Sequence, residues 1–250
     1  MMKFCVQPAN LIGLFTIIAF LHTPLALKPA YGINPVSCKA VSVPLPADHK
    51  MKAYRIVYDS LHLSAKGLAS DAFENAIAGY EKLKEKGALS KEDILTIADF
   101  TQPSSQKRLF VIDLKHCKLL YHTYVAHGEN SGQKMATAFS NRNESLQSSP
   151  GFYVTSGTFD GKHGYSMKLK GMEKNVNDKA EERGIIMHSA AYVSEHFIRT
   201  HGYLGRSWGC PAVSKEMNKP IISKIKNGSC LFIYSKCKNY FKQSVLLKSV

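Results

Sequence analysis

The stretch that decides the fold and the chemistry is GIIMHSAAYVSEHFIRTHGYLGRSWGCPAV, residues 184–213. It opens with an apolar run over residues 185–187 that ends at His188, which predicts a buried strand with a histidine at its end. A helical segment and a loop punctuated by glycines follow, and the loop closes with Ser-Trp-Gly-Cys-Pro at 207–211. A cysteine between glycine and proline lies at a sharp turn, where neighbouring N–H groups can converge on a developing oxyanion.

Cys210 and His188 are the candidate catalytic pair in this stretch. A cysteine reacts as its thiolate, so a free thiol with a pKa near 8.5 needs an imidazole or a positive field close by. The chain has 10 histidines, however, and most histidines in proteins are structural or solvated. A zinc site of His188, His196, His201 and Cys210 is the alternative, but their spacing matches no compact zinc motif, and we expect no metal.

The same stretch resembles the catalytic motif of the YkuD-like L,D-transpeptidase family, in which a histidine after a strand is followed, about twenty residues on, by Ser-x-Gly-Cys. Residues 205–211, Gly-Arg-Ser-Trp-Gly-Cys-Pro, are similar to the murein L,D-transpeptidase branch of that family. Trp208 stands where most members have a histidine, so we assign it only to packing or to the wall of the pocket. The resemblance covers about residues 54–236 and includes further short motifs at 107–114, 125–128, 148–153 and 161–164, together with Arg183.

The resemblance implies a role for each matching residue. Cys210 would be the nucleophile and His188 the base, with the Ser189 carbonyl fixing the tautomer of the ring. The N–H groups of Gly209 and Cys210 would form the oxyanion hole. Ser207 would brace the loop, and the expected substrate contacts are Arg206, His127 and His163, each of which has a structural role as its alternative.

The resemblance also implies the fold and the reaction. The fold would be the L,D-transpeptidase catalytic β-sandwich or barrel, a β-rich mixed α/β domain. Cys210 would form a thioester with a peptidoglycan tetrapeptide stem, release D-alanine and pass the acyl group to an amine of a second stem, with no cofactor. Two alternatives stay open: an L,D-carboxypeptidase that uses water as acceptor, and a wall-binding module without catalysis.

Outward from this stretch, the pattern of apolar residues predicts further elements. Helical spacing favours helices over 67–86, 190–199 and 214–226, and Ser90 with Asp93 gives a capping-box-like start to a short helix over 91–98. Segments 108–114 and 118–125 predict a hairpin, and other strands are expected at 151–156, 166–169, 184–187 and 229–234. The polar segment 128–150 is a long loop, and such loops tend to carry function.

The pattern of residues 1–32 is typical of a secretory leader. Lys3 precedes an apolar run of residues 11–21, which is too short to span a bilayer but suits a signal peptide. An uncleaved anchor or a buried helix is the alternative. We therefore expect export to the periplasm or cell envelope, a helical lead-in over 33–102, a catalytic domain over 103–240 and a tail over 241–250.

Charge and cysteine content complete the expectations. The net charge of +14 favours anionic partners, and in an exported chain without nucleic-acid motifs the best candidate is a wall polymer; a merely basic proteome is the alternative. Nothing in the sequence indicates the oligomeric state.

Six cysteines are present, and Cys5 lies in the leader. Parity then predicts one free thiol, Cys210, and two disulfides among Cys38, Cys117, Cys230 and Cys237.

Overall fold

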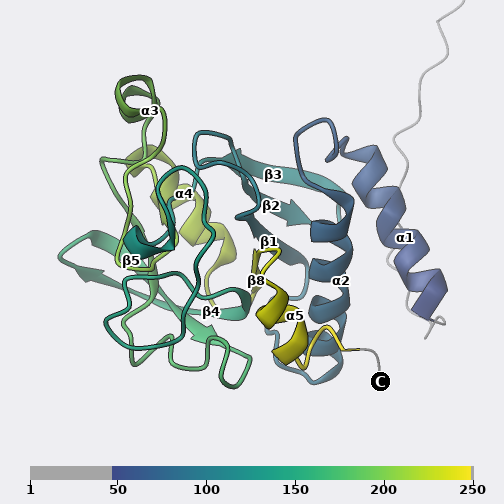
Figure 1. Cartoon of the computed structure of the whole chain (residues 1–250). Coiled ribbons are helices and arrows are strands. Elements are labelled where there is room, and N and C mark those ends of the chain that lie inside the picture. Colours follow the sequence, from purple (N-terminus) through teal and green to yellow (C-terminus); the bar gives the residue numbers. More distant parts are fainter. Residues whose placement is uncertain (1–46, 249–250) are drawn as a thin grey trace, which may run out of the picture. The chain divides into compact units, whose positions relative to one another are not determined.

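The computed structural model describes residues 47–248, so the expected leader and Cys38 lie outside the described residues. The helices are α1 Ala47–Ser60, α2 Ser70–Glu85, the 3-10 turn η1 Glu129–Ser131, α3 Glu195–His201, α4 Lys215–Ile225 and α5 Lys238–Gln243 (Figure 1). The strands are β1 Ile94–Asp99, β2 Leu109–Asp113, β3 Lys118–Thr123, β4 Gly151–Gly161, β5 Gly164–Gly171, β6 Ile186–Ser189, β7 Ala212–Val213 and β8 Cys230–Tyr234.

All eight strands belong to one sheet, in the order β3-β2-β1-β8-β4-β5-β6-β7. Most neighbours are antiparallel, but β1 pairs with β8 in parallel and β6 pairs with β7 in parallel. Ala126, just beyond β3, forms an isolated bridge to Ala212 in β7. The two ends of the sheet therefore approach each other, and the sheet is nearly closed. The expected β-rich mixed α/β fold is confirmed.

The central strands are buried on both faces, which explains their nearly unbroken apolar sequences. In β1, Leu95 and Ile97 join a core formed with α2 and α5, whereas Ile94 and Ala98 join a second core formed with α4. Successive residues of β2 and β8 divide between the same two cores, because side chains alternate along a strand. Figure 1 shows α2 and α5 beside one face of the sheet and α4 beside the other.

The helix predicted over 91–98 is wrong, because Ile94–Asp99 forms the central strand β1. Short apolar runs suit a buried strand as well as a buried helix, and β-branched Ile94, Thr96 and Ile97 favour the strand. The supposed cap is instead a turn, in which the Lys91 N–H donates to the Gly228 carbonyl. The division of the chain at residues 102 and 240 stays a prediction.

The other predicted elements are confirmed, with shifted ends. The strands expected at 151–156 and 166–169 extend to the long hairpin of β4 and β5. The helix expected over 190–199 begins only at Glu195, because the Ser194 hydroxyl accepts from the Phe197 N–H and caps the first turn. Ser214 caps α4 in the same way, and this helix stops before Asn227 and Gly228, both with positive φ.

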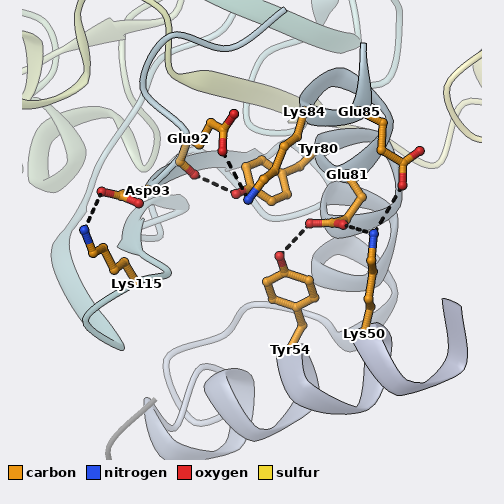
Figure 2. Close-up of polar contacts among 9 residues, drawn as sticks. All are labelled: Lys50, Tyr54, Tyr80, Glu81, Lys84, Glu85, Glu92, Asp93 and Lys115. Carbon is orange, nitrogen blue, oxygen red and sulfur yellow. Dashed lines mark hydrogen bonds and ion pairs between the residues drawn. The ribbon is translucent and has the colours of Figure 1, made fainter. Parts of the chain in front are cut away.

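Helix α1 is attached to α2 by polar side chains on its inner face. The Lys50 ammonium lies 3.0 Å from the Glu81 carboxylate and 3.3 Å from that of Glu85, and the Tyr54 hydroxyl donates to Glu81 over 2.6 Å. Figure 2 shows these three contacts converging on one side of α2. The helical element is therefore held to the domain by hydrogen bonds in addition to the contact of Val57 with the core.

The structure bears on the expected disulfides and on whether a helix could cross a membrane. Cys230 and Cys237 are free thiols, so the prediction of two disulfides among Cys38, Cys117, Cys230 and Cys237, which needs all four, is wrong. Cys230 is buried in β8 among apolar side chains and behaves as a small hydrophobic residue. Between residues 47 and 248, none of the helices has both the length and the apolar character needed to cross a membrane.

Candidate active site

Strands β6 and β7 bring His188 and Cys210 to the same end of the sheet. His188 lies in β6 opposite Ala212 of β7, and Cys210 precedes Ala212 by two residues. In this parallel register Cys210 stands two positions before the residue opposite His188, and a strand advances about 3.3 Å per residue. Residues that are 22 positions apart in the sequence thus become neighbours through the β6–β7 pairing.

The tautomer of His188 is set by its own strand. The Nδ1 atom lies 2.9 Å from the Ser189 carbonyl, which can only accept, so Nδ1 carries the proton and Nε2 keeps its lone pair. The ring is 3% exposed, and this burial lowers the pKa of His188; the Ser189 carbonyl opposes the shift, whereas the charges of His163 and Lys162 add to it. His188 is therefore neutral near pH 7, as a proton acceptor must be.

The Cys210 thiol rests on the backbone of the same strand. The Ile186 N–H donates to Sγ over 3.5 Å, and Sγ lies 3.7 Å from the Gly184 carbonyl. Burial raises the pKa of the Cys210 thiol, while the Ile186 N–H and the positive charges of Arg183 and Lys162 pull it down. Within residues 47–248 no hydrogen bond joins Sγ to His188. The raised pKa of the thiol and the lowered pKa of the ring favour the neutral form of both groups near pH 7.

Ser207 braces the loop before Cys210. Its hydroxyl donates to the Cys210 carbonyl over 2.6 Å and accepts from the Gly209 N–H over 3.1 Å. The Gly209 N–H is thus already used, which corrects its expected place in the oxyanion hole. The Cys210 N–H has no acceptor among the described residues. Of the two backbone N–H groups expected in the oxyanion hole, it is therefore the one that is free to bind a substrate oxygen.

Glycine at position 209 is required by close backbone contact. Its φ is +119°, and a Cβ atom would lie 2.7 Å from the Gln147 carbonyl oxygen and 3.1 Å from the Ile185 side chain. The Ser148 hydroxyl also donates to the Gly209 carbonyl over 3.1 Å. The loop that carries Cys210 is therefore packed directly on the segment around residues 147–148.

Arg183 fixes the conformation of that neighbouring segment. Its Nη1 donates to the Ser140 carbonyl over 2.8 Å and to the Ser149 hydroxyl over 2.5 Å. Its Nη2 donates to the Ser145 hydroxyl over 3.1 Å and to the Gln147 carbonyl over 2.6 Å. The sequence assigned no role to Arg183, because its partners lie about 40 residues earlier in a loop without periodicity.

His127 is a structural residue in this fold and does not reach the open site. It is fully buried, with Nδ1 2.7 Å from the Arg108 guanidinium and Nε2 3.0 Å from the Gly132 carbonyl. Since a guanidinium can only donate, the proton of the ring is on Nε2. Burial, followed by the charge of Arg108, lowers the pKa of His127 to about 4. With both nitrogens engaged, His127 does not fit the expected substrate contact.

The tip of the β4–β5 hairpin lies over the candidate pair. Residues 161–164 form the turn, and the His163 ring stacks on His188 with centroids 4.3 Å apart and planes 24° apart. The ammonium of the preceding residue, Lys162, lies 5.2 Å from the centroid of the Trp208 ring. Trp208 is 67% exposed. His163 therefore lies against the candidate base, and its expected contact with substrate stays a prediction.

The remaining expected residues are dispersed. Arg206 donates from Nη1 to the Glu129 carbonyl over 3.3 Å and is half-buried. His196 and His201 are exposed on α3, and the His201 ring stacks on Phe197. The alternative zinc site is thus not assembled, and among residues 47–248 no three His, Cys, Asp or Glu side chains are grouped closely enough to hold a metal.

A cleft of about 250 Å³ opens between the loop that carries Cys210 and the segment before β4. Its lining combines one carboxylate, one aliphatic side chain, one guanidinium and one indole, from Glu144, Leu146, Arg183 and Trp208. Trp208 is two residues from Cys210, and Arg183 is one of the two cations whose charges act on the thiol.

Comparison with known families identifies one match. The family model described as L,D-transpeptidase catalytic domain matches residues 64–234, which is more than half of the 250 residues. Comparison with curated proteins finds no significant relative.

Solved structures with a similar arrangement include an L,D-transpeptidase from Mycobacterium smegmatis, at 12% identity and a TM-score of 0.37, covering 57% of this chain and 59% of its own. An L,D-transpeptidase (Yku) from Stackebrandtia nassauensis shares 15% identity at a TM-score of 0.36, over 77% of this chain and 81% of its own. The helical cell shape determining protein Pgp2 from Campylobacter jejuni shares 13% identity at a TM-score of 0.39, over 58% and 48%. This chain spans about 59% of the length of the first of these.

Proposed function

Because the chain belongs to the L,D-transpeptidase catalytic-domain family, we propose that it is a cysteine acyltransferase acting on peptidoglycan tetrapeptide stems, with Cys210 as nucleophile and His188 as base. The observation that carries the proposal is the preparation of His188: Nδ1 is tied to the Ser189 carbonyl, so that Nε2 is left to accept a proton. The Cys210 Sγ atom accepts a hydrogen bond from Ile186, the first residue of the strand that contains His188.

The first half-reaction forms a thioester. As Nε2 of His188 takes the thiol proton, Sγ attacks the carbonyl of the bond between the L-centre of diaminopimelate and D-alanine. The negative charge that develops on the carbonyl oxygen is stabilised by the Cys210 N–H. When the C–N bond breaks, the proton held by His188 passes to the departing amine, and D-alanine leaves.

The second half-reaction decides between the two enzymatic alternatives. An amine of a second stem attacks the thioester; His188, neutral again, takes a proton from that amine and returns it to Sγ as the C–S bond breaks and the crosslink forms. Attack by water, with the same proton transfers, gives a tripeptide. Transfer wins when the amine is held in line at high effective molarity, because water is always present. We propose that transfer is the main outcome, since a cleft at Trp208, two residues before Cys210, offers room for a second substrate group.

The setting of this reaction is part of the same proposal. Peptidoglycan is an anionic polymer outside the membrane, which fits the +14 charge and an exported chain. We propose that residues 1–32 direct export to the periplasm or envelope and that residues 103–240 carry the catalytic machinery.

The test uses purified protein and disaccharide tetrapeptides, with the products separated and weighed. The proposal predicts release of D-alanine and dimers joined between two diaminopimelates. Cys210→Ala should stop both products, while the matched control Cys237→Ala, at a half-buried thiol before α5, should keep them. Tripeptides alone would make the protein a carboxypeptidase. Binding of stems without any product would favour the wall-binding module.

A further inference from the structure

The tip of the β4–β5 hairpin is tied to the strand that carries the candidate base. The register of β4 and β5 runs to Gly161 and Gly164, so the turn has two residues, of which His163 is the second. The Ser189 hydroxyl donates to the His163 carbonyl over 3.3 Å. The carbonyl of the same serine accepts from Nδ1 of His188. Ser189 therefore joins the hairpin tip and the base at one point of β6.

The His163 ring covers one face of the His188 ring. With centroids 4.3 Å apart and planes 24° apart, the two flat rings are in stacking contact. His163 is exposed, whereas His188 is only 3% exposed. The outer ring therefore shields the inner one from water, although it comes from a hairpin 25 positions earlier in the sequence.

The stack gives the His188 ring a constraint that its hydrogen bond cannot supply. The bond to the Ser189 carbonyl fixes Nδ1, but the ring can still tilt about the line from Cβ to Nδ1. Contact across the whole face with the His163 ring opposes this tilt. A general base must hold its acceptor atom within hydrogen-bond reach of the proton, and small misplacements are costly. Since no hydrogen bond to the thiol orients His188 at rest, its neighbours must do so.

The hairpin tip also acts on the charge of His188. Burial lowers the pKa of His188, the Ser189 carbonyl opposes this shift, and the charges of His163 and then Lys162 add to it. A like charge disfavours protonation of its neighbour. Both groups whose charges act on the ring belong to the hairpin tip, and the Cys210 thiol on the neighbouring loop is neutral near pH 7. The tip therefore helps to keep the base unprotonated.

We propose that His163 is a positioning residue for the reaction, which holds the His188 ring in the plane from which Nε2 accepts the thiol proton. The inference rests on the proposed function, because His188 needs a fixed plane only if it transfers a proton. His163 itself makes and breaks no bond. The proton moves from Sγ of Cys210 to Nε2 of His188 and then to the departing amine, while the two rings stay stacked.

Two variants separate the stack from the charge, with D-alanine release from disaccharide tetrapeptides measured as a function of pH. His163→Ala removes the ring, so the rate on the plateau should fall about threefold to tenfold, the range expected for loss of an aromatic pair. His163→Phe keeps a flat ring and should restore most of this rate. It also removes the charge, so the acid limb of the profile should move to higher pH as the pKa of His188 rises.

The matched control is His201→Ala. His201 is likewise an exposed histidine in a stack, with its centroid 4.0 Å from that of Phe197 on α3. Its removal should change neither the plateau nor the acid limb.

Full activity in His163→Ala, or a rate in His163→Phe as low as that in His163→Ala, would overturn the proposal. A second measurement needs no turnover: the ring protons of His188, assigned by their loss in His188→Gln, are titrated by NMR. The pKa of His188 should be higher in His163→Phe than in the unmodified protein, and an unchanged value would count against the stack. If the unmodified protein releases no D-alanine at all, the proposed function fails, whereas the NMR titration still decides whether His163 acts on His188.

Discussion

The Ile186 N–H donates to the Sγ atom of Cys210 over 3.5 Å, and Ile186 stands two residues before His188 in the same strand. One strand, β6, therefore supports both the candidate nucleophile and the candidate base. The thiol and the ring are each tied to the backbone, at Ile186 and Ser189, and the two are not bonded to each other. A proton must consequently move between them during the reaction instead of before it.

This arrangement predicts that His188 acts on the rate of acylation and not on the resting charge of the thiol. Burial lowers the pKa of His188 and raises that of Cys210, so the ring is already neutral where the thiol titrates. In His188→Gln, D-alanine release should fall at least about 100-fold, as expected for loss of a general base. The pKa seen in iodoacetamide alkylation of Cys210 should hardly move. A resting thiolate–imidazolium pair would give the opposite result, a raised thiol pKa on loss of the imidazolium.

The control for this experiment is His196→Gln, at an exposed position on α3. It should behave like the unmodified protein in both assays. A thiol pKa that rises by a full unit in His188→Gln would show that a thiolate–imidazolium pair exists at rest, contrary to the structure.

Arg183 should affect Cys210 through charge and through the loop, and two variants separate these effects. Arg183→Gln removes the positive charge that lowers the pKa of the thiol, so the alkylation pKa should rise. Arg183→Lys keeps a charge but cannot reproduce four hydrogen bonds from a planar fork, so the pKa should rise less. Both variants should lose D-alanine release. Equal pKa values in all three proteins would remove Arg183 from the electrostatics of the thiol.

Gly209→Ala should disable the protein although it adds a single methyl group. The new Cβ would lie 2.7 Å from the Gln147 carbonyl oxygen, at a backbone φ of +119°. We expect a loss of about 1–3 kcal/mol in the free energy of unfolding, together with a large loss of D-alanine release. Gly157→Ala is the matched control, because a Cβ there meets nothing within 4 Å. Full activity in Gly209→Ala would mean that the loop around Cys210 is not held as described.

The buried His127 should make the free energy of unfolding fall in acid. Its pKa is about 4 in the folded protein, below the unfolded value of 6.5, so the unfolded chain takes up a proton that the folded chain does not. The stabilisation is complete above pH 6.5 and falls as the pH drops towards 4, by roughly 3 kcal/mol at about 1.4 kcal/mol per unit. In His127→Gln, whose amide can still accept from Arg108 and donate to Gly132, this part of the slope should disappear. Urea unfolding at several pH values measures it, and an unaltered slope would contradict the assignment.

Much of the fold could be predicted from the sequence, because most elements carry a local signal. The hairpin of β2 and β3, the helices α2 and α4 and the strand before His188 all follow from apolar periodicity and from capping serines. Strand β1 could not be predicted in this way. Its type depends on β2 and β8 pairing on either side, which is a long-range contact that overrides a cap-like pattern at Ser90.

The candidate site shows the same division. The motif pointed to Cys210, His188 and Ser189, and the expected contact of the Ser189 carbonyl with the ring is present. The motif could not show that the Gly209 N–H is used by Ser207, or that His127 is buried against Arg108. Nor could it assign a role to Arg183, whose partners lie in a loop that has no repeating pattern. Side-chain partners of this kind are set by tertiary packing, which a motif does not describe.

The most direct test of the central claim is the mass of the protein during turnover. Purified protein is mixed with disaccharide tetrapeptide, quenched in acid within seconds, digested and weighed. The account predicts a peptide containing Cys210 that carries the acyl group of the stem without its D-alanine, formed as free D-alanine appears and absent in Cys210→Ala. D-alanine release with the adduct on another residue, or with Cys210→Ala as active as the unmodified protein, would contradict it.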